Sequence, residues 1–157
     1  MRISRRCEGR VIAKKKEKQK KAKENNCLTI LNPAPARKIQ KEDFSLLDFF
    51  TPNETEAEFY LNKKIETKED IQNAAKEFLS MGVKNIIITL GAKGVYFENK
   101  EENYFIDALS LKDEVIDTTG AGDAFNGALA VALAKDSNYK NAIIFANKVG
   151  GISTTRL

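Results

Sequence analysis

One stretch restricts the fold more than any other part of this 157-residue chain: residues 117–128, with the sequence DTTGAGDAFNGA. An apolar run ends just before it at Ile116, and small and apolar residues recur at helical spacing from Ala124 to Ala134. The stretch therefore predicts the end of a strand, a glycine-bearing turn and the first turn of a helix.

The same stretch predicts a binding site for an anion. The first N–H groups of a helix lack partners and carry the positive end of the helix dipole. Gly120 and Gly122, on either side of Ala121, let the backbone approach a ligand closely. Such a socket most often binds phosphate.

Asp123 lies inside this socket, where a carboxylate would repel a bound anion. A role as general base, taking a proton from a hydroxyl that attacks the phosphate, accounts for its placement. The alternative is a plain turn between strand and helix, with an acidic residue that favours the helix dipole.

The complete stretch 117–128 resembles the second signature of the ribokinase, or phosphofructokinase-B-type, family of sugar kinases. Neither the Walker A pattern nor the protein-kinase loops occur in the chain. The resemblance implies that Asp123 is the catalytic base acting on the substrate hydroxyl. It further implies that Gly120, Ala121 and Gly122 form the anion hole.

The resemblance covers residues 10–157, which correspond to the carboxyl-terminal half of a typical family member. The fold it implies is an incomplete Rossmann-like, three-layer α/β/α sheet. Residues 1–9 match nothing expected there and stay unassigned. The lid and most of the sugar-binding side chains belong to the other half.

Composition excludes several classes of function. With 42% hydrophobic and 31% charged residues the chain has an ordinary soluble composition, and no apolar run approaches the roughly 18 residues of a membrane span. There is no histidine, which excludes a Ser-His-Asp triad and histidine-bound zinc. Cys7 and Cys27 are too few for a disulfide framework, so we expect a cytoplasmic protein.

The net charge of +4 is unevenly distributed. Residues 1–24 contain 11 Lys/Arg and 3 Asp/Glu, whereas the rest of the chain contains 15 Lys/Arg and 19 Asp/Glu. We interpret the lysine-rich residues 10–24 as a solvated surface helix; a basic arm for nucleic acid or acidic lipid is the alternative.

A short apolar run, residues 27–31, predicts a buried parallel strand, and Asn-Pro-Ala-Pro-Ala follows at residues 32–36. These five residues resemble the ribokinase branch of the family more than the adenosine or fructose kinases. The resemblance therefore implies phosphorylation of a small sugar, most simply the 5-OH of D-ribose. Fructose, a nucleoside or another pentose stays open.

A second strand is expected over residues 46–50, followed by Thr51-Pro52-Asn53-Glu54-Thr55-Glu56. Taken alone, Thr51 and Asn53 predict a turn and a helix cap. The family resemblance implies instead that Asn53 lies near the nucleotide phosphates and that Glu56 helps to organise Mg²⁺, through water.

Residues 68–81 have the pattern of an amphipathic helix that ends at Gly82, and residues 85–90 that of a core strand. A glycine turn and a hairpin of residues 95–98 and 104–106 follow. By resemblance the turn holds ATP, and Gly122 also contacts it. The implied ATP-binding residues in the turn are Thr89, Gly91, Ala92, Lys93 and Gly94, although an exposed lysine is the simpler interpretation of Lys93.

The resemblance also implies a potassium site, with the Asp117 carboxylate, the Thr119 carbonyl and Ser153 as ligands. The alternative for Asp117 is a residue that fixes the turn by hydrogen bonds. A last helix is expected over residues 138–150, where the resemblance places Asn147 beside the adenine; a surface asparagine is the alternative.

Two functions of different classes follow. The first is an ATP-dependent sugar kinase; the second is a catalytically inactive remnant that at most binds nucleotide. For turnover by these 157 residues alone we favour the remnant, because the unmatched residues 1–9 and the end at Leu157 suggest a truncated gene. A half sheet exposes a strand edge, which predicts weak stability, self-association, or pairing with a separate amino-terminal half.

Overall fold

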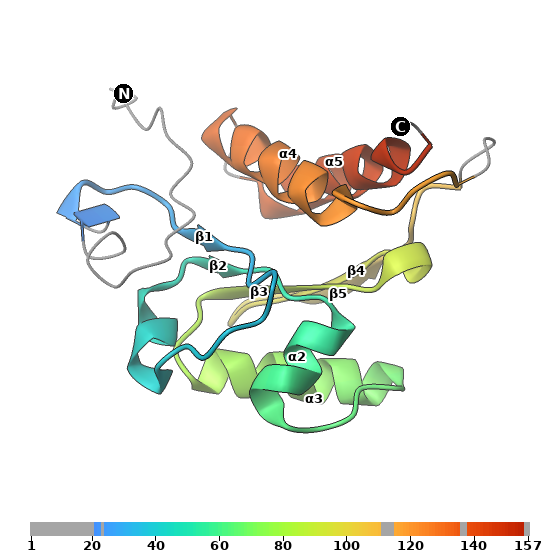
Figure 1. The fold of residues 1–157 in the computed structure, drawn as a ribbon. Coiled ribbons are helices and arrows are strands. Elements are labelled where there is room, and N and C mark those ends of the chain that lie inside the picture. Colours follow the sequence, from blue (N-terminus) through green and yellow to red (C-terminus); the bar gives the residue numbers. More distant parts are fainter. Residues whose placement is uncertain (1–20, 23, 111–114, 136–137, 156–157) are drawn as a thin grey trace.

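The computed structural model describes residues 21–22, 24–110, 115–135 and 138–155. A single sheet separates two layers of helices: α4 (Ala121–Lys135) and α5 (Tyr139–Ser153) cover one face, and α2 (Glu54–Leu61) and α3 (Lys68–Ser80) the other (Figure 1). This arrangement confirms the predicted three-layer α/β/α fold.

The sheet has the order β1-β2-β3-β4-β5. Its first three strands are parallel, and the last two run antiparallel to their neighbours. The strands are β1 (Ile30–Leu31), β2 (Phe49–Phe50), β3 (Asn85–Thr89), β4 (Val95–Glu98) and β5 (Asn103–Ile106). The predicted hairpin is confirmed as β4 and β5.

Strands β2, β3 and β4 are buried almost throughout, because helices cover both faces of the sheet and successive side chains of a strand point to opposite faces. Phe49 and Ile87 belong to the core beneath α4 and α5, whereas Phe50 and Ile86 belong to the core against α2 and α3. All four side chains are fully buried. Two-sided burial explains why the sequence of these strands is apolar without alternation.

The helices agree closely with the sequence pattern. Thr67 and Asp70 form a reciprocal capping box at the start of α3, and Gly82 follows its end with φ +105°, as the glycine stop predicts. α5 continues to Ser153 rather than ending near residue 150, and the Asn138 side chain caps its start by accepting a hydrogen bond from the Asn141 N–H.

Two strand predictions were too long. Residues 27–29 lie outside β1 because the N–H of Thr29 donates to the Asp48 carboxylate (2.9 Å) instead of to a neighbouring strand. Leu46 lies outside β2 because it ends a 3₁₀ helix, η1 (Lys41–Leu46).

The strand end predicted at Ile116 was wrong. The structure has no strand over residues 115–118, since the N–H groups of Ile116 and Asp117 both donate to the Thr154 carbonyl at the end of α5 (2.8 and 3.1 Å). The residues before the turn are therefore hydrogen-bonded to the end of a helix and not to a strand of the sheet.

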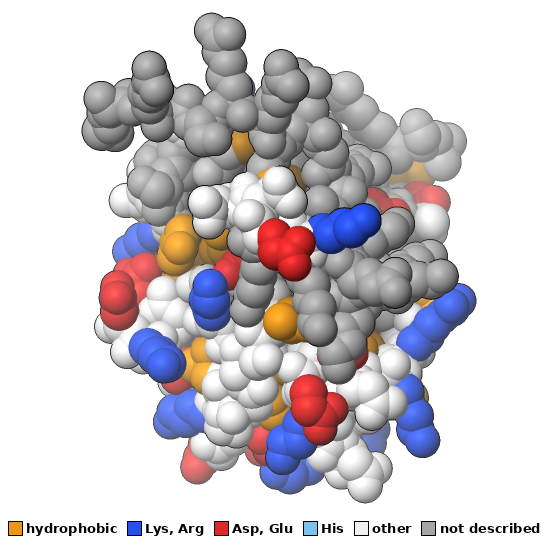
Figure 2. Space-filling view, turned by 90° about the vertical axis from the view of Figure 1, so that its left-hand side faces the viewer, with side chains coloured by type: hydrophobic (Ala, Val, Ile, Leu, Met, Phe, Trp, Pro, Cys, Tyr) orange, Lys and Arg blue, Asp and Glu red, His pale blue; other side chains and the backbone are white. Residues whose placement is uncertain are grey.

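Most of the basic segment predicted as a helix lies outside the described residues; within it, Lys21, Ala22 and Glu24 are helical, and Ala22 is buried. Figure 2, which shows the side at the left of Figure 1, has cationic and anionic side chains interspersed over the described surface. Within the described ranges, no helix is long and apolar enough to cross a membrane.

Candidate active site

The carboxyl ends of the parallel strands bring two predicted nucleotide loops together. The Thr89 N–H donates to the Pro52 carbonyl (3.0 Å), and Thr89, the last residue of β3, forms a parallel bridge with Asn53, which lies beyond the end of β2. Ligand sites of open α/β sheets lie at these strand ends. The residues after β2 and after β3 therefore share one edge, as the family resemblance implied.

Asn53 and Glu56 form the cap of α2. The Asn53 Oδ1 accepts from the Glu56 N–H (2.8 Å), and the Glu56 Oε2 accepts from the Asn53 N–H (2.9 Å). The predicted helix cap is thus confirmed. Glu56 is buried, and its Oε1 accepts no hydrogen bond from the described residues. One carboxylate oxygen is left to face a cation or its water.

The loop after β3 is a short 3₁₀ turn, η2 (Gly91–Lys93), with Gly91 at φ +57° and Gly94 at φ +96°. The Lys93 side chain is 71% exposed, and its Nζ lies 3.7 Å from the Glu54 Oε1. Lys93 therefore lies at the surface beside Glu54.

The first turn of α4 leaves backbone donors free. The Ala121 N–H donates to the Thr118 carbonyl (3.2 Å), and the Ala124 N–H donates to the Gly120 carbonyl (2.9 Å). Between them, the N–H groups of Gly122 and Asp123 have no acceptor within the part of the chain that the structure describes. Free donors at a helix start with a positive dipole end form an anion site.

The backbone of this turn requires glycine at residue 120. Gly120 has φ +80°, which an L-residue adopts only with strain, and a side chain there would project into open space. A Cβ on Gly122 would lie 3.7 Å from the Nδ2 of Asn32, so this turn faces the end of β1. The Asn32 that opens the predicted sugar-specificity segment therefore borders the anion site.

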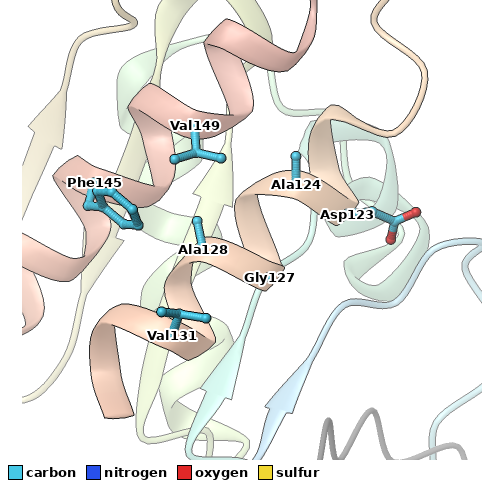
Figure 3. Close-up of a pocket in the computed structure, with 7 residues that line it drawn as sticks. All are labelled: Asp123, Ala124, Gly127, Ala128, Val131, Phe145 and Val149. Atoms are coloured by element: carbon cyan, nitrogen blue, oxygen red, sulfur yellow. The ribbon is translucent and has the colours of Figure 1, made fainter. Parts of the chain in front are cut away.

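Asp123 is exposed and lies at the mouth of an open groove of about 440 Å³ between α4 and α5 (Figure 3). Small and apolar side chains line the rest of the groove, namely Ala124, Gly127, Ala128, Val131, Phe145 and Val149. Figure 3 shows the carboxylate at the start of α4, directed away from Phe145 and Val131. The carboxylate therefore lies away from the apolar lining of the groove.

Asp117 fixes the turn before α4. Its Oδ1 accepts from the Thr119 N–H (2.8 Å), which lowers the pKa of the Asp117 carboxyl below its usual value. The turn-fixing interpretation of Asp117 is thus confirmed. The bonds to Thr154 bring the turn beside Ser153, whose hydroxyl donates to the Gly150 carbonyl (2.7 Å).

Asn147, on α5, donates from its Nδ2 to the Asp107 carbonyl beyond β5 (2.9 Å). It is half-buried rather than a free surface amide. The side chain thus ties α5 to the chain that leaves the hairpin.

One residue of the site was not singled out from the sequence. Asn126 accepts from the Thr51 hydroxyl (2.7 Å) and donates to the Gly122 carbonyl (2.8 Å). Its place within residues 117–128, one turn after Gly122, was the only available signal. Direct hydrogen bonds or ion pairs between the first turn of α4 and Asn53 or Glu56 are absent from the described residues.

No three acidic or cysteine side chains gather into a metal site in the described ranges. A magnesium ion requires fewer: it usually binds one or two carboxylates, several waters and the substrate phosphates. The free oxygen of Glu56 fits such a partial site.

A family profile described as "pfkB family carbohydrate kinase" matches residues 10–157. Ribokinase from Staphylococcus aureus is 41% identical over 136 residues, which are 86% of this chain and 44% of that protein. The chain thus spans less than half the length of this curated relative.

Solved structures agree with this comparison. The crystal structure of ribokinase from Thermotoga maritima has a TM-score of 0.77 and 42% identity over 88% of this chain and 46% of that one. The structure of ribokinase from Arabidopsis thaliana, complexed with ribose and ATP, has a TM-score of 0.83 and 28% identity. The match covers 89% of this chain and 45% of that one.

Proposed function

The chain belongs to the pfkB family of carbohydrate kinases, and from this premise we propose that it carries the phosphoryl-transfer half of an ATP-dependent sugar kinase. One observation supports this most directly. The free N–H groups of Gly122 and Asp123 and the exposed Asp123 carboxylate lie together at the carboxyl end of the sheet.

The proposed chemistry places a base and an anion hole on one turn. Asp123 takes the proton of a sugar hydroxyl. The hydroxyl oxygen forms a bond to the γ-phosphorus, and the bond from that phosphorus to the leaving oxygen of ADP breaks. The N–H groups at the start of α4 stabilise the charge on the transferred phosphoryl group. ATP supplies the phosphoryl group, and Mg²⁺ neutralises charge on its phosphates.

The remaining predicted residues are assigned to the nucleotide and its cations. We assign Asn53 and the η2 loop to ATP, with Thr89, Gly91, Ala92, Lys93 and Gly94 along the loop, and Asn147 to the adenine side. Glu56 is assigned to Mg²⁺ through its free oxygen. For K⁺ we propose Asp117, Thr119 and Ser153, which adjoin one another through the bonds to Thr154.

For the sugar we propose D-ribose, phosphorylated at its 5-OH. Support comes from Asn32, which borders Gly122, and from the two ribokinases that are about 40% identical to this chain. A panel of ribose, deoxyribose, fructose and adenosine discriminates among the sugars that the sequence leaves open.

The sheet edge supports a proposal about partners. The outer edge of β1 pairs with no strand in the described ranges, and the full-length relatives are about twice as long as this chain. We propose that a separate amino-terminal half, or self-association, supplies the sugar-binding part. A cytoplasmic location, where ATP and sugars are available, accompanies this proposal.

The deciding experiment measures ribose-dependent ADP release by the purified chain with Mg²⁺ and K⁺. If self-association supplies the sugar-binding part, the purified chain should release ADP. Asp123→Asn should abolish this release, whereas Glu69→Gln, which alters an exposed carboxylate of α3, should retain it. The absence of ribose-dependent ADP release by the unaltered chain would refute turnover by these residues alone. Titration with MgATP would then show whether the chain is a nucleotide-binding remnant.

A further inference from the structure

We propose that Asn126 is a positioning residue that, together with Thr51, holds the first turn of α4 against the end of β2. The contact is a property of the structure alone. Its consequence for phosphate binding rests on the proposed function. Neither residue touches the reacting groups in this assignment; both act through the backbone of Gly122.

The donors and acceptors of this link follow from the chemistry of its groups and from their distances. A backbone carbonyl can only accept, so the amide nitrogen of Asn126, not its oxygen, must face the Gly122 carbonyl (2.8 Å). The Oδ1 of Asn126 then faces Thr51 (2.7 Å). The Thr51 hydroxyl has one proton and two acceptors in reach, and we assign the proton to Asn126 because the Leu31 carbonyl is more distant (3.3 Å). The chain of bonds therefore runs from Thr51 through Asn126 to Gly122.

One end of this link is firmly anchored. Thr51 is 2% exposed and directly follows β2, and its N–H donates to the Leu31 carbonyl of the neighbouring strand (2.9 Å). Thr51 is separated from Asn126 by 75 residues in sequence. The bond thus fastens α4 to the sheet at a point that local sequence does not specify.

The other end needs support. Gly120 and Gly122 have no side chains with which to pack, and no heavy atom lies within 4 Å of the Cβ position of Gly120. The free N–H groups of Gly122 and Asp123 cannot hold the turn either, since they have no acceptor in the described part of the chain. Within the described residues, the Asn126 amide is the side-chain group that hydrogen-bonds to the Gly122 carbonyl, in addition to the backbone of α4.

This support matters because an anion hole works only when its donors are already aimed at the charge. Thr51 also precedes Pro52 and Asn53, so the same bond sets the distance between the cap of α2 and the turn of α4. We infer that it holds the two phosphate-binding elements in register.

The first test is independent of kinase activity. Thr51→Val keeps the shape and removes the donor, and NMR of the whole chain is expected to show shifted amide signals for Gly122 and Asp123. Thr51→Ser keeps the donor and is expected to preserve these signals. Thr29→Val is the matched control, since that buried hydroxyl bonds to Asp48 and Leu46 instead.

Unchanged signals in Thr51→Val, or an equal change in Thr29→Val, would overturn the positioning role. This result does not depend on whether the chain binds nucleotide. The two proposals can therefore fail separately.

The second test measures MgATP affinity in a double-mutant cycle. Thr51→Val and Asn126→Ala are each expected to weaken MgATP binding about 3- to 10-fold, the equivalent of one hydrogen bond. The double variant should bind no more weakly than the single variant with the lower affinity. Losses that multiply would overturn the pairing. No MgATP binding by the unaltered chain would refute the proposed function, while the NMR result would still decide the role of Asn126.

Discussion

Gly94 offers the sharpest quantitative test of the structure. It has φ +96° and ψ −130°, a region that L-residues scarcely occupy, and a Cβ there would lie 2.0 Å from the Ile106 carbonyl oxygen. The neighbouring backbone atoms of Asp107 and Ala108 would also be within 2.7 Å. Gly94→Ala therefore requires the end of β5 to move.

Gly91 is the matched control because it lies three residues earlier in the same turn. It also has a positive φ, +57°, but no atom lies within 4 Å of its Cβ position. Gly91→Ala should cost about 1 kcal/mol, the ordinary price of a left-handed alanine.

The expected cost of Gly94→Ala is larger by two contributions. A sparsely populated backbone region costs about 1–3 kcal/mol. Relief of the clash by displacing Gly94 also weakens the bonds of the Gly94 N–H to the Gly91 carbonyl (3.1 Å) and of the Leu90 N–H to the Gly94 carbonyl (2.8 Å), about 1 kcal/mol each. The free energy of unfolding should therefore fall by about 3–5 kcal/mol.

Urea unfolding followed by circular dichroism measures both variants. The expected result is a Gly94→Ala chain that is less stable than Gly91→Ala by at least about 2 kcal/mol, or already unfolded without urea. Equal losses for the two variants would show that the hairpin does not approach Gly94 as described.

Three further predictions concern single side chains. The Tyr104 hydroxyl is buried with no hydrogen-bond partner in the described residues, and burial raises its pKa. Tyr104→Phe should therefore keep the unfolding free energy or increase it by up to about 1 kcal/mol. A lower Tm of the variant would contradict this. The Thr67 hydroxyl and N–H lower the pKa of Asp70, so its stabilisation is present at neutral pH and lost as pH falls below about 4; an NMR titration midpoint at or above the usual value for aspartate would refute it. Asn53→Ala should cost about 1 kcal/mol by removing the cap of α2, and a loss no greater than that of the exposed Asn141→Ala would argue against the capping box.

Local patterns predicted most of the secondary structure. The pair Thr67 and Asp70 starts α3 and Gly82 ends it, because capping and glycine stops depend on residues that are neighbours in sequence. The hairpin and the helix start at residues 120–123 are likewise local. The anion socket could be predicted for the same reason, since it consists of the free donors of one helix turn.

The errors arose where distant residues compete for a backbone group. The strand end expected at Ile116 was lost because Thr154, at the end of α5, accepts its N–H. β1 is shorter than its apolar run because the Asp48 side chain takes the Thr29 N–H. In both cases the competitor could not be identified from spacing along the chain.

The sequence by itself therefore determined the α/β class, the start and end of α3 and the turn that carries Asp123, since each depends on neighbouring residues. Only the tertiary structure decided how that turn is aimed. Asn126, whose amide donates to the Gly122 carbonyl, is joined to Thr51 by a hydrogen bond although the two residues lie 75 residues apart. A single hydrogen bond over such a distance leaves no periodic pattern in sequence, because its geometry exists only after the sheet and α4 have packed together.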